Sequence, residues 1–327
     1  MLALVADLHL GARPCARDES ACESFASFVS ALPDLGVDHL LLLGDTLELL
    51  EGRSGPPATA GEAVDRCRAV LEGARVAMLA LTRAADTGCR VSMLVGNHDA
   101  DLARPEVRAL LLQRLNPMRS RPVEVVDWFV LLAGRLYAEH GHQHHDINRV
   151  PRVLDPDDPR RPGDLLRPLG AVANARPTAA WAAAGRCART DCTPLDPLYL
   201  GRLEQYGRAC GLDLPVVAAL DRLSATDRRH TAARLIRRGW HRAPPDAYLV
   251  DAATRVDALL AAAGAQVPVL AFGHTHQARD VRLPTGGRYL NPGAWATASP
   301  GAFHYALIGR DANGADTGLR TWRPVRG

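Results

Sequence analysis

The amino-acid sequence predicts an α/β fold that is interrupted by a helical insertion. Over residues 1–145, short apolar runs alternate with longer amphipathic segments, as strands and helices do in α/β domains. Over residues 146–245 the strand signals nearly vanish, and Ala, Arg and Pro accumulate. Strand signals return over residues 246–327. We therefore expect a core in two parts, 1–145 and 246–327, with residues 146–245 laid over it as a helical cap.

The first part of the core contains predicted strands and helices in alternation. Apolar runs predict strands at residues 2–6, 38–43, 90–95, 123–126, 129–133 and 135–139. Apolar residues at helical spacing predict helices at residues 18–32, 62–86 and 105–115. The helix at 62–86 is expected to be continuous, with Gly88 as its stop signal.

The remaining elements follow the same reasoning. Within the insertion we expect helices at residues 178–187, 195–210 and 226–238. The second part of the core is expected to contain a helix, a buried strand, a hairpin and two further strands, at residues 246–263, 267–272, 280–290, 303–309 and 317–323.

Composition argues against several classes of protein. A formal net charge of +3 and a pI near 8.6 are too mild to indicate a nucleic-acid-binding protein, which usually has a strongly basic face. Residues 1–7 lack the regions of a signal peptide, and no apolar stretch reaches the roughly 18 residues that a membrane span needs. The seven cysteines, an odd number, indicate reduced thiols. We therefore expect a globular, cytoplasmic protein.

Metal-ligand residue types follow the ends of the predicted strands. Asp7 and His9 follow the first strand, and residues two apart on extended backbone point to the same side. Asp45 follows the second strand and Asn97 the third, each directly after a glycine that lets the backbone turn sharply. Because ligands of open α/β sheets gather at the carboxyl ends of the strands, we expect these side chains to lie close together.

Three more candidate ligands come from later in the chain. His140 follows the strand at 135–139, and Gly273-His274-Thr275-His276 places two imidazoles on one side after an apolar run. The whole set offers two carboxylates, one amide oxygen and four imidazoles. This mixture suits a pair of divalent or mixed-valence metal ions, with Mn²⁺ expected first and Fe or Zn as alternatives. Calcium alone would prefer ligands that are all oxygen.

The sequence resembles the calcineurin-like metallophosphoesterase family in five blocks, which occur in the family's order: Asp7-Leu8-His9, Gly44-Asp45, Gly96-Asn97-His98-Asp99, His140 and Gly273-His274-Thr275-His276. The resemblance implies a two-sheet αββα sandwich. It also implies that one metal ion takes Asp7, His9 and His276, that the other takes Asn97, His140 and His274, and that Asp45 bridges them.

Such a site implies a reaction class. Two cations about 3.5–4 Å apart would lower the pKa of a shared water, provide a bridging hydroxide and neutralise the phosphoryl oxygens. We expect hydrolysis of a phosphate ester or phosphoanhydride in a phosphorylated small-molecule or nucleotide-type substrate. His98 would protonate the leaving oxygen or steady the phosphoryl group, with Asp99 fixing its tautomer and charge. His142 and Arg149 are expected to reach toward the anionic substrate.

Several alternatives stay open. The segments Asp7-Leu8-His9-Leu10 and Asp45-Thr46-Leu47-Glu48, with the insertion, resemble the branch that cleaves UDP-2,3-diacylglucosamine. His98 departs from that branch, which usually has arginine there, and His142 replaces its aspartate, so a phosphodiesterase or phosphomonoesterase is the first expectation. A DNA nuclease and a metal-free interaction scaffold are further alternatives, and the sequence predicts no oligomeric state. Glu48 either orients a ligand or is a helix-terminal glutamate favoured by the helix dipole.

Overall fold

The computed structural model describes residues 1–12, 16–50, 57, 59–116, 123–145, 148–150, 153, 156–158, 164–167, 246–296, 303–311 and 314–323, with the side chains of 16–20 excepted. The helices predicted at 178–187, 195–210 and 226–238 lie outside the described residues. The division into a two-part core and a cap therefore stays a prediction.

Six described strands form one sheet in the order β11-β10-β1-β2-β3-β4. These strands are β1 (Leu2–Val5), β2 (His39–Leu42), β3 (Arg90–Leu94), β4 (Val123–Val126), β10 (Phe303–Ile308) and β11 (Gly318–Trp322). The strands β1 to β4 run parallel, whereas β10 is antiparallel to β1 and to β11. The carboxyl ends of β1, β2 and β3 therefore lie at one edge of the sheet.

Five described strands form a second sheet in the order β5-β6-β7-β9-β8. These strands are β5 (Phe129–Leu132), β6 (Leu136–Glu139), β7 (Val269–Ala271), β8 (Ala278–Arg282) and β9 (Arg288–Pro292). The inner strands β6, β7 and β9 run parallel, and β8 forms the predicted hairpin with β9. Because β6 pairs with β7, this sheet joins strands that lie before residue 145 with strands that lie after residue 246.

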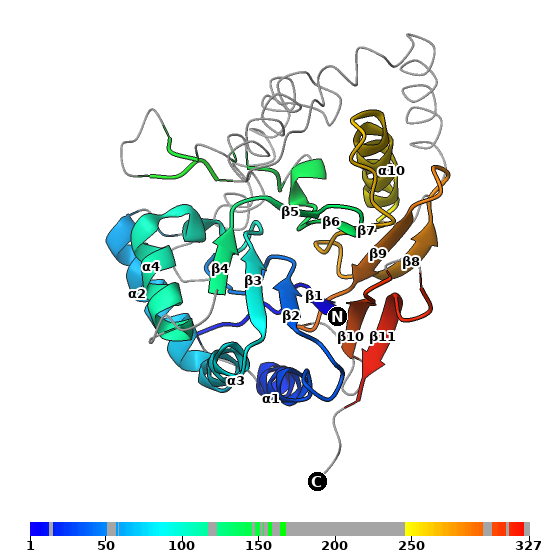
Figure 1. Ribbon diagram of the computed structural model, residues 1–327. Helices are drawn as coiled ribbons and strands as arrows, with labels where there is room; N and C mark the ends of the chain where they lie inside the picture. Colours follow the sequence, from blue (N-terminus) through cyan, green and yellow to red (C-terminus); the bar gives the residue numbers. More distant parts are fainter. Residues whose placement is uncertain are drawn as a thin grey trace.

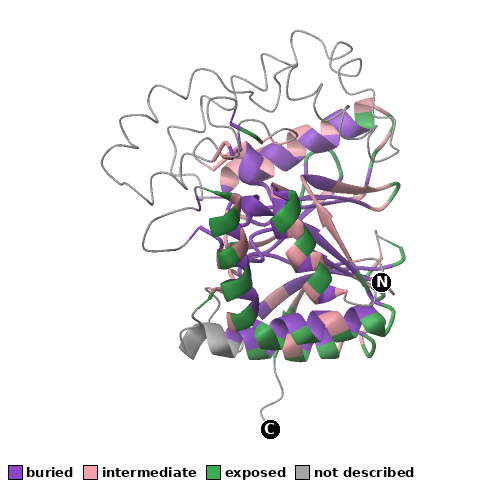
Figure 2. Cartoon of the chain, turned by 90° about the vertical axis from the view of Figure 1, so that its left-hand side faces the viewer, coloured by how far each residue is buried: buried purple, intermediate pink, exposed green. Residues whose placement is uncertain are grey.

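The two sheets pack face to face, and the alternation of side chains along the strands explains how. Leu2 and Leu4 of β1 belong to the same buried cluster as Val269 and Ala271 of β7, so this cluster fills the space between the sheets. Ala3 and Val5 of β1 point to the opposite side, into a cluster shared with the helices. Figure 2 shows many strand residues and the inner helix faces as buried and the outer helix faces as exposed.

Helices cover both outer faces (Figure 1). The first sheet is covered by α1 (Ala16–Ser30), α2 (Ala60–Gly73), α3 (Arg75–Asp86) and α4 (Pro105–Leu115). The second sheet is covered by α10 (Ala247–Ala262), whose Leu249, Val256 and Leu260 pack with Tyr137 and Leu270. The chain therefore has the predicted two-sheet αββα sandwich. None of the described helices has the length and the apolar character to cross a bilayer.

One predicted helix is wrong in its extent. Residues 62–86 form two helices, α2 and α3, which are separated at Ala74. A Cβ on Gly73 would lie 2.6 Å from the carbonyl oxygen of Gly11, so the backbone of the two segments is pressed together there. Ala74 stays buried, and the apolar spacing therefore continues across the break.

Candidate metal centre

The seven predicted ligands come together where the strands of the two sheets end. Asp7 and His9 follow β1, Asp45 follows β2 and Asn97 follows β3, while His140 follows β6 and the pair His274 and His276 follows β7. Because these five strands face each other across the sandwich, their carboxyl ends meet at one place.

Asp7, His9 and His276 form one group of donor atoms, all within 4.8 Å of one another. The Nε2 atoms of His9 and His276 are 3.2 Å apart, and His276 Nε2 lies 3.4 Å from Asp7 Oδ1. Ligands of one metal ion, each about 2.1 Å from it, are separated by roughly 3 Å when they are neighbours. This group therefore has the spacing of one ion's ligands.

Asp45, His140 and His274 form a second group within the same limit. His140 Nε2 lies 3.2 Å from Asp45 Oδ2 and 3.2 Å from Asn97 Oδ1. The same Asp45 oxygen is 3.9 Å from Nε2 of His9, so it faces both groups. This is the geometry that a bridging carboxylate requires.

The backbone of the ligand loops is unusual. Five of the seven residues have positive φ: Asp7 (53°), His9 (46°), Asp45 (49°), His274 (71°) and His276 (58°). No other non-glycine residue in the described part of the chain has a positive φ. Left-handed backbone costs free energy for side chains other than glycine, and residues held there cluster at functional sites.

Two glycines make room for the ligands that follow or face them. A Cβ on Gly96 would lie 2.2 Å from Asp45 Oδ1, and a Cβ on Gly44 would lie 2.6 Å from His140 Nδ1. Gly44 also has a φ of 89°. Both glycines are required for close approach, and Gly44 is also required for the turn.

The buried atoms of the centre fit a pair of cations. Asp7 is completely buried; its Oδ2 accepts the N–H of His274 at 2.9 Å, but its Oδ1 has no hydrogen bond. A buried carboxylate oxygen without a donor is costly unless positive charge lies near it. The mixed oxygen and imidazole donors suit manganese, iron or zinc.

The carboxylates strongly favour positive charge at this place. Burial by itself lowers the pKa of His9, but the hydrogen bond to Glu48 and the charges of Asp45 and Asp7 outweigh it and raise that pKa to about 9. Burial also lowers the pKa of His140, but the charge of Asp45 and its hydrogen bond outweigh burial and raise that pKa to about 10. The pKa of Asp45 is well below its usual range because the surrounding imidazoles outweigh its burial.

His98 has a donor atom within 4.8 Å of donor atoms of His9 and Asp45, and Glu48 holds its ring. Its Nδ1 is 2.6 Å from Glu48 Oε2, and its backbone N–H donates to Asp45 Oδ1 at 2.8 Å. Burial lowers the pKa of His98, but the hydrogen bond to Glu48 and the charge of Asp45 outweigh burial and raise it. The sequence left the role of Glu48 open, although its place three residues after Asp45 was a usable signal.

The prediction that Asp99 fixes the tautomer of His98 is wrong. The Asp99 carboxylate is buried and accepts three backbone N–H groups, those of Gly96 (2.6 Å), Thr46 (2.8 Å) and Leu47 (3.3 Å). It therefore ties the loop after β2 to the loop after β3. Burial and the nearby charge of Asp45 raise its own pKa.

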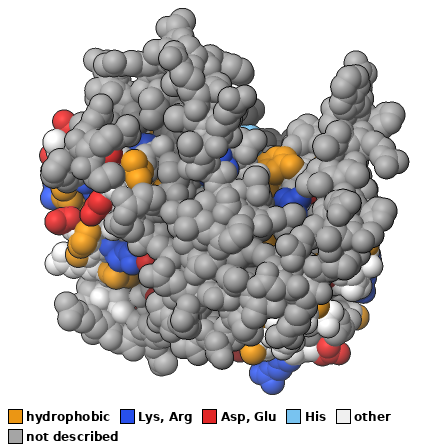
Figure 3. Space-filling view, turned by 90° about the horizontal axis from the view of Figure 1, so that it is seen from above, with side chains coloured by type: hydrophobic (Ala, Val, Ile, Leu, Met, Phe, Trp, Pro, Cys, Tyr) orange, Lys and Arg blue, Asp and Glu red, His pale blue; other side chains and the backbone are white. Residues whose placement is uncertain are grey.

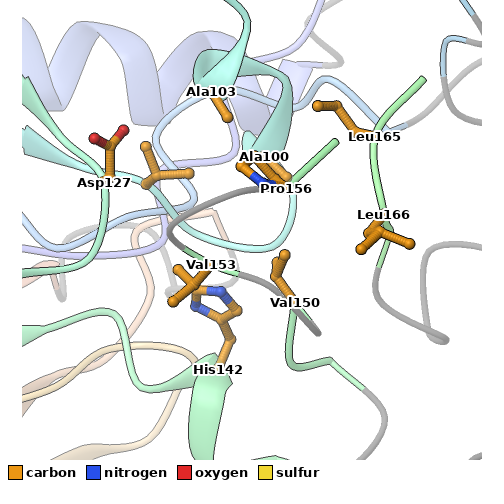
Figure 4. Close-up of a pocket in the computed structure, with 10 residues that line it drawn as sticks. Ala100, Ala103, Asp127, His142, Val150, Val153, Pro156, Leu165 and Leu166 are labelled. Atoms are coloured by element: carbon orange, nitrogen blue, oxygen red, sulfur yellow. The ribbon is translucent and has the colours of Figure 1, made fainter. Parts of the chain in front are cut away.

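Of the two predicted substrate contacts, His142 lies beside a predicted ligand, with its ring centroid 5.2 Å from that of His140. His142 is buried and lines a small pocket, shown in Figure 4, whose other walls are Val95, Ala100, Ala103, Asp127, Val150, Val153, Pro156, Leu165 and Leu166. Arg149 is partly buried, and its backbone N–H donates to the carbonyl of His145. Apolar walls and a carboxylate disfavour a phosphoryl group in this pocket. Contacts of His142 and Arg149 with substrate stay predictions.

The described surface agrees with the mild net charge. On the face that Figure 3 shows, the basic, acidic and hydrophobic side chains of described residues are intermixed, and the basic ones among them do not gather into a broad stripe.

Comparisons with known proteins identify the family. A family model for calcineurin-like phosphoesterases matches residues 1–186, whereas a comparison with curated proteins gave no match. Among solved structures, the protein TT1561 of Thermus thermophilus aligns with 13% identity and a TM-score of 0.37, covering 98% of each chain. A dimetal phosphatase from Danio rerio aligns with 13% identity and a TM-score of 0.44, covering 93% of this chain and 91% of the other. The family match covers more than half of the chain, which therefore belongs to the calcineurin-like phosphoesterases, hydrolases that act on phosphate esters with the help of metal ions.

Proposed function

We propose that this protein is a dinuclear metallophosphoesterase that hydrolyses a phosphodiester or phosphomonoester of a phosphorylated small molecule or nucleotide-type compound, with Mn²⁺ as its metal. One observation carries the proposal: two groups of donor atoms, Asp7-His9-His276 and Asp45-His140-His274, lie side by side, and one oxygen of Asp45 faces both. Asn97 joins the second group through its contact with His140.

The proposed roles of the chain's own residues follow from their contacts. Two bound metal ions would neutralise the phosphoryl oxygens and lower the pKa of water near them. His98, which Glu48 and Asp45 favour in its protonated form, is placed to donate a proton to the leaving oxygen. The backbone N–H of His98 donates a hydrogen bond to Asp45. This bond holds His98, the proposed acid, at a fixed position relative to the proposed metal ligands.

The proposal is tested by removing and restoring metal. The chelated protein is reloaded with Mn²⁺, Fe²⁺ or Zn²⁺, the metal content per chain is measured, and hydrolysis is followed on aryl monoesters, aryl diesters, nucleotides and nucleotide-sugar pyrophosphates. We expect two ions per chain and hydrolysis that chelator abolishes and Mn²⁺ restores. Hydrolysis that survives complete metal removal, or a chain that binds no stoichiometric metal, would contradict it.

The same panel separates the substrate classes. Fastest turnover of a diester or monoester supports the proposed activity, whereas fastest turnover of a nucleotide-sugar pyrophosphate would replace it with a pyrophosphatase of the UDP-2,3-diacylglucosamine type. Single-stranded and duplex DNA are included as the nuclease arm. A metal-free chain without any hydrolysis would indicate an interaction scaffold.

A further inference from the structure

One ring nitrogen of His274 lies against a small group of residues outside the predicted ligand set. Its Nε2 lies 3.2 Å from Nδ1 of His145 and 3.3 Å from the side-chain nitrogen of Asn148. The same Asn148 atom is 2.8 Å from Nδ1 of His145. The three polar groups therefore meet at one point behind His274.

The two nitrogens of an imidazole lie on different edges of the ring, so only one of them can face a metal ion. Nε2 of His274 faces His145 and Asn148, which leaves Nδ1 for the group with Asp45 and His140. In this arrangement Nε2 carries the ring proton and donates it to Nδ1 of His145, because the Asn148 nitrogen is itself a donor; metal-bound histidines donate their second ring N–H in the same way.

His145 is itself held in place by contacts from two directions. Its ring stacks on Tyr248 in the first turn of α10, with ring centroids 5.3 Å apart and planes inclined by 26°. Its backbone N–H donates to the carbonyl of His142, and its carbonyl accepts the N–H of Asn148, both at 3.1 Å. The His145 ring thus has little freedom to turn away from His274.

We propose that His145 is a positioning residue, which Tyr248 and Asn148 clamp, and that it fixes the ring of His274 so that Nδ1 is presented to the second metal ion. The inference rests on the proposed dinuclear function. It also gives α10 a role beyond covering the second sheet, because the helix reaches the metal centre through Tyr248.

Metal affinity, measured without any substrate, tests this proposal. The metal-free protein is titrated with Mn²⁺ by calorimetry for the parent chain, His145→Ala, His145→Asn and Tyr248→Leu. Loss of a partner behind a metal-bound histidine costs about 10–100-fold in metal affinity. We expect His145→Ala to weaken one of the two binding steps by that factor, Tyr248→Leu to weaken the same step less, and His145→Asn to restore it, since Oδ1 of asparagine can occupy the place of Nδ1.

A matched control is His304→Ala, which removes an imidazole from β10 whose Nδ1 lies 3.2 Å from the hydroxyl of Thr321 and which belongs to neither group of donors. It should bind both ions like the parent chain, and thermal unfolding verifies that each variant is folded. Parent-like binding of both ions by His145→Ala, or equal weakening of both steps, would overturn the proposal. A parent chain that binds fewer than two ions would instead overturn the dinuclear function, so the two failures are distinguishable.

Discussion

Glu48 and His98 are joined by a contact of 2.6 Å between Oε2 and Nδ1, and the same carboxylate oxygen lies 3.0 Å from Nδ1 of His9. One buried carboxylate therefore holds both the proposed acid and a proposed metal ligand. The two imidazoles outweigh the burial of Glu48 and lower its pKa to about 2, so it is ionised throughout the neutral range.

Glu48→Gln is expected to lower kcat by about 10–100-fold, within the range that acid catalysis contributes. The neutral amide no longer stabilises the imidazolium, so the pKa of His98 falls and the loss of activity at high pH begins at a lower pH. A kcat–pH profile measures the shift, and Glu106→Gln on α4 is the control. An unchanged profile would show that Glu48 has no influence on the acid.

Asp45→Ala and His98→Ala are expected to fail in different ways. Asp45 faces both groups of donors, so its loss should remove both metal ions and all turnover. His98→Ala should retain two ions and lose about 10²–10⁴-fold in kcat, because it removes only the proton donor. Metal content and kcat are measured on the same samples. Two ions in Asp45→Ala would rule out the bridging role.

Metal binding is expected to release protons. His9 and His140, with pKa values raised to about 9 and about 10, are protonated at neutral pH in the metal-free chain, and a metal ligand must be neutral imidazole. About two protons should leave per chain, and the apparent affinity should rise with pH. Calorimetry in two buffers of different ionisation enthalpy gives the number. A heat that is independent of buffer would contradict the assignment of these two ligands.

Gly96→Ala is expected to abolish metal binding although it changes no ligand. The new Cβ would lie 2.2 Å from Oδ1 and 2.5 Å from the backbone nitrogen of Asp45, so the bridging residue must move. Gly11→Ala is the matched control, because no atom lies within 4 Å of its Cβ position. Two ions bound by Gly96→Ala would show that the Asp45 loop tolerates displacement.

His39 is expected to make stability depend on pH. Burial, together with the charge of Arg90, lowers its pKa from 6.5 to about 4 in the folded chain. The unfolded chain therefore binds more protons between these values, and stability is lost as the pH falls through that window, by up to about 1.4 kcal/mol per pH unit. Urea unfolding at pH 7 and pH 5 compares the parent chain with His39→Gln, which can keep the contact with Ser92. Equal losses in both would show that other groups cause the acid sensitivity.

Much of the fold was predictable because local signals and burial agree. The predicted bounds of α4 and β4 match the structure, and Gly88 ends α3 with a φ of 106° as expected. The break at Ala74 was not predictable, since it depends on the contact of Gly73 with the backbone of Gly11, far away in the sequence. Apolar spacing predicts which face of a helix is buried, but it does not predict a backbone contact between distant residues.

In the candidate site, too, local sequence signals predicted some features, whereas contacts between distant residues were not predictable. The seven candidate donors were predicted because each follows the end of a strand, and such ends meet in space. The partner of His98 was assigned to its neighbour Asp99, but the chain turns so that Asp99 faces backbone N–H groups and Glu48 faces the ring. Tyr248 carried no signal, because only the packing of α10 brings it to His145.

Left-handed backbone lowers the stability of the folded chain at five of the proposed ligands: Asp7, His9, Asp45, His274 and His276. Each of these residues bears a penalty of about 1–2 kcal/mol that glycine would escape. Variants with glycine at these positions are therefore expected to gain stability and, under the proposed function, to lose metal ligands. Selection for turnover would therefore retain aspartate and histidine at these positions in spite of their backbone strain.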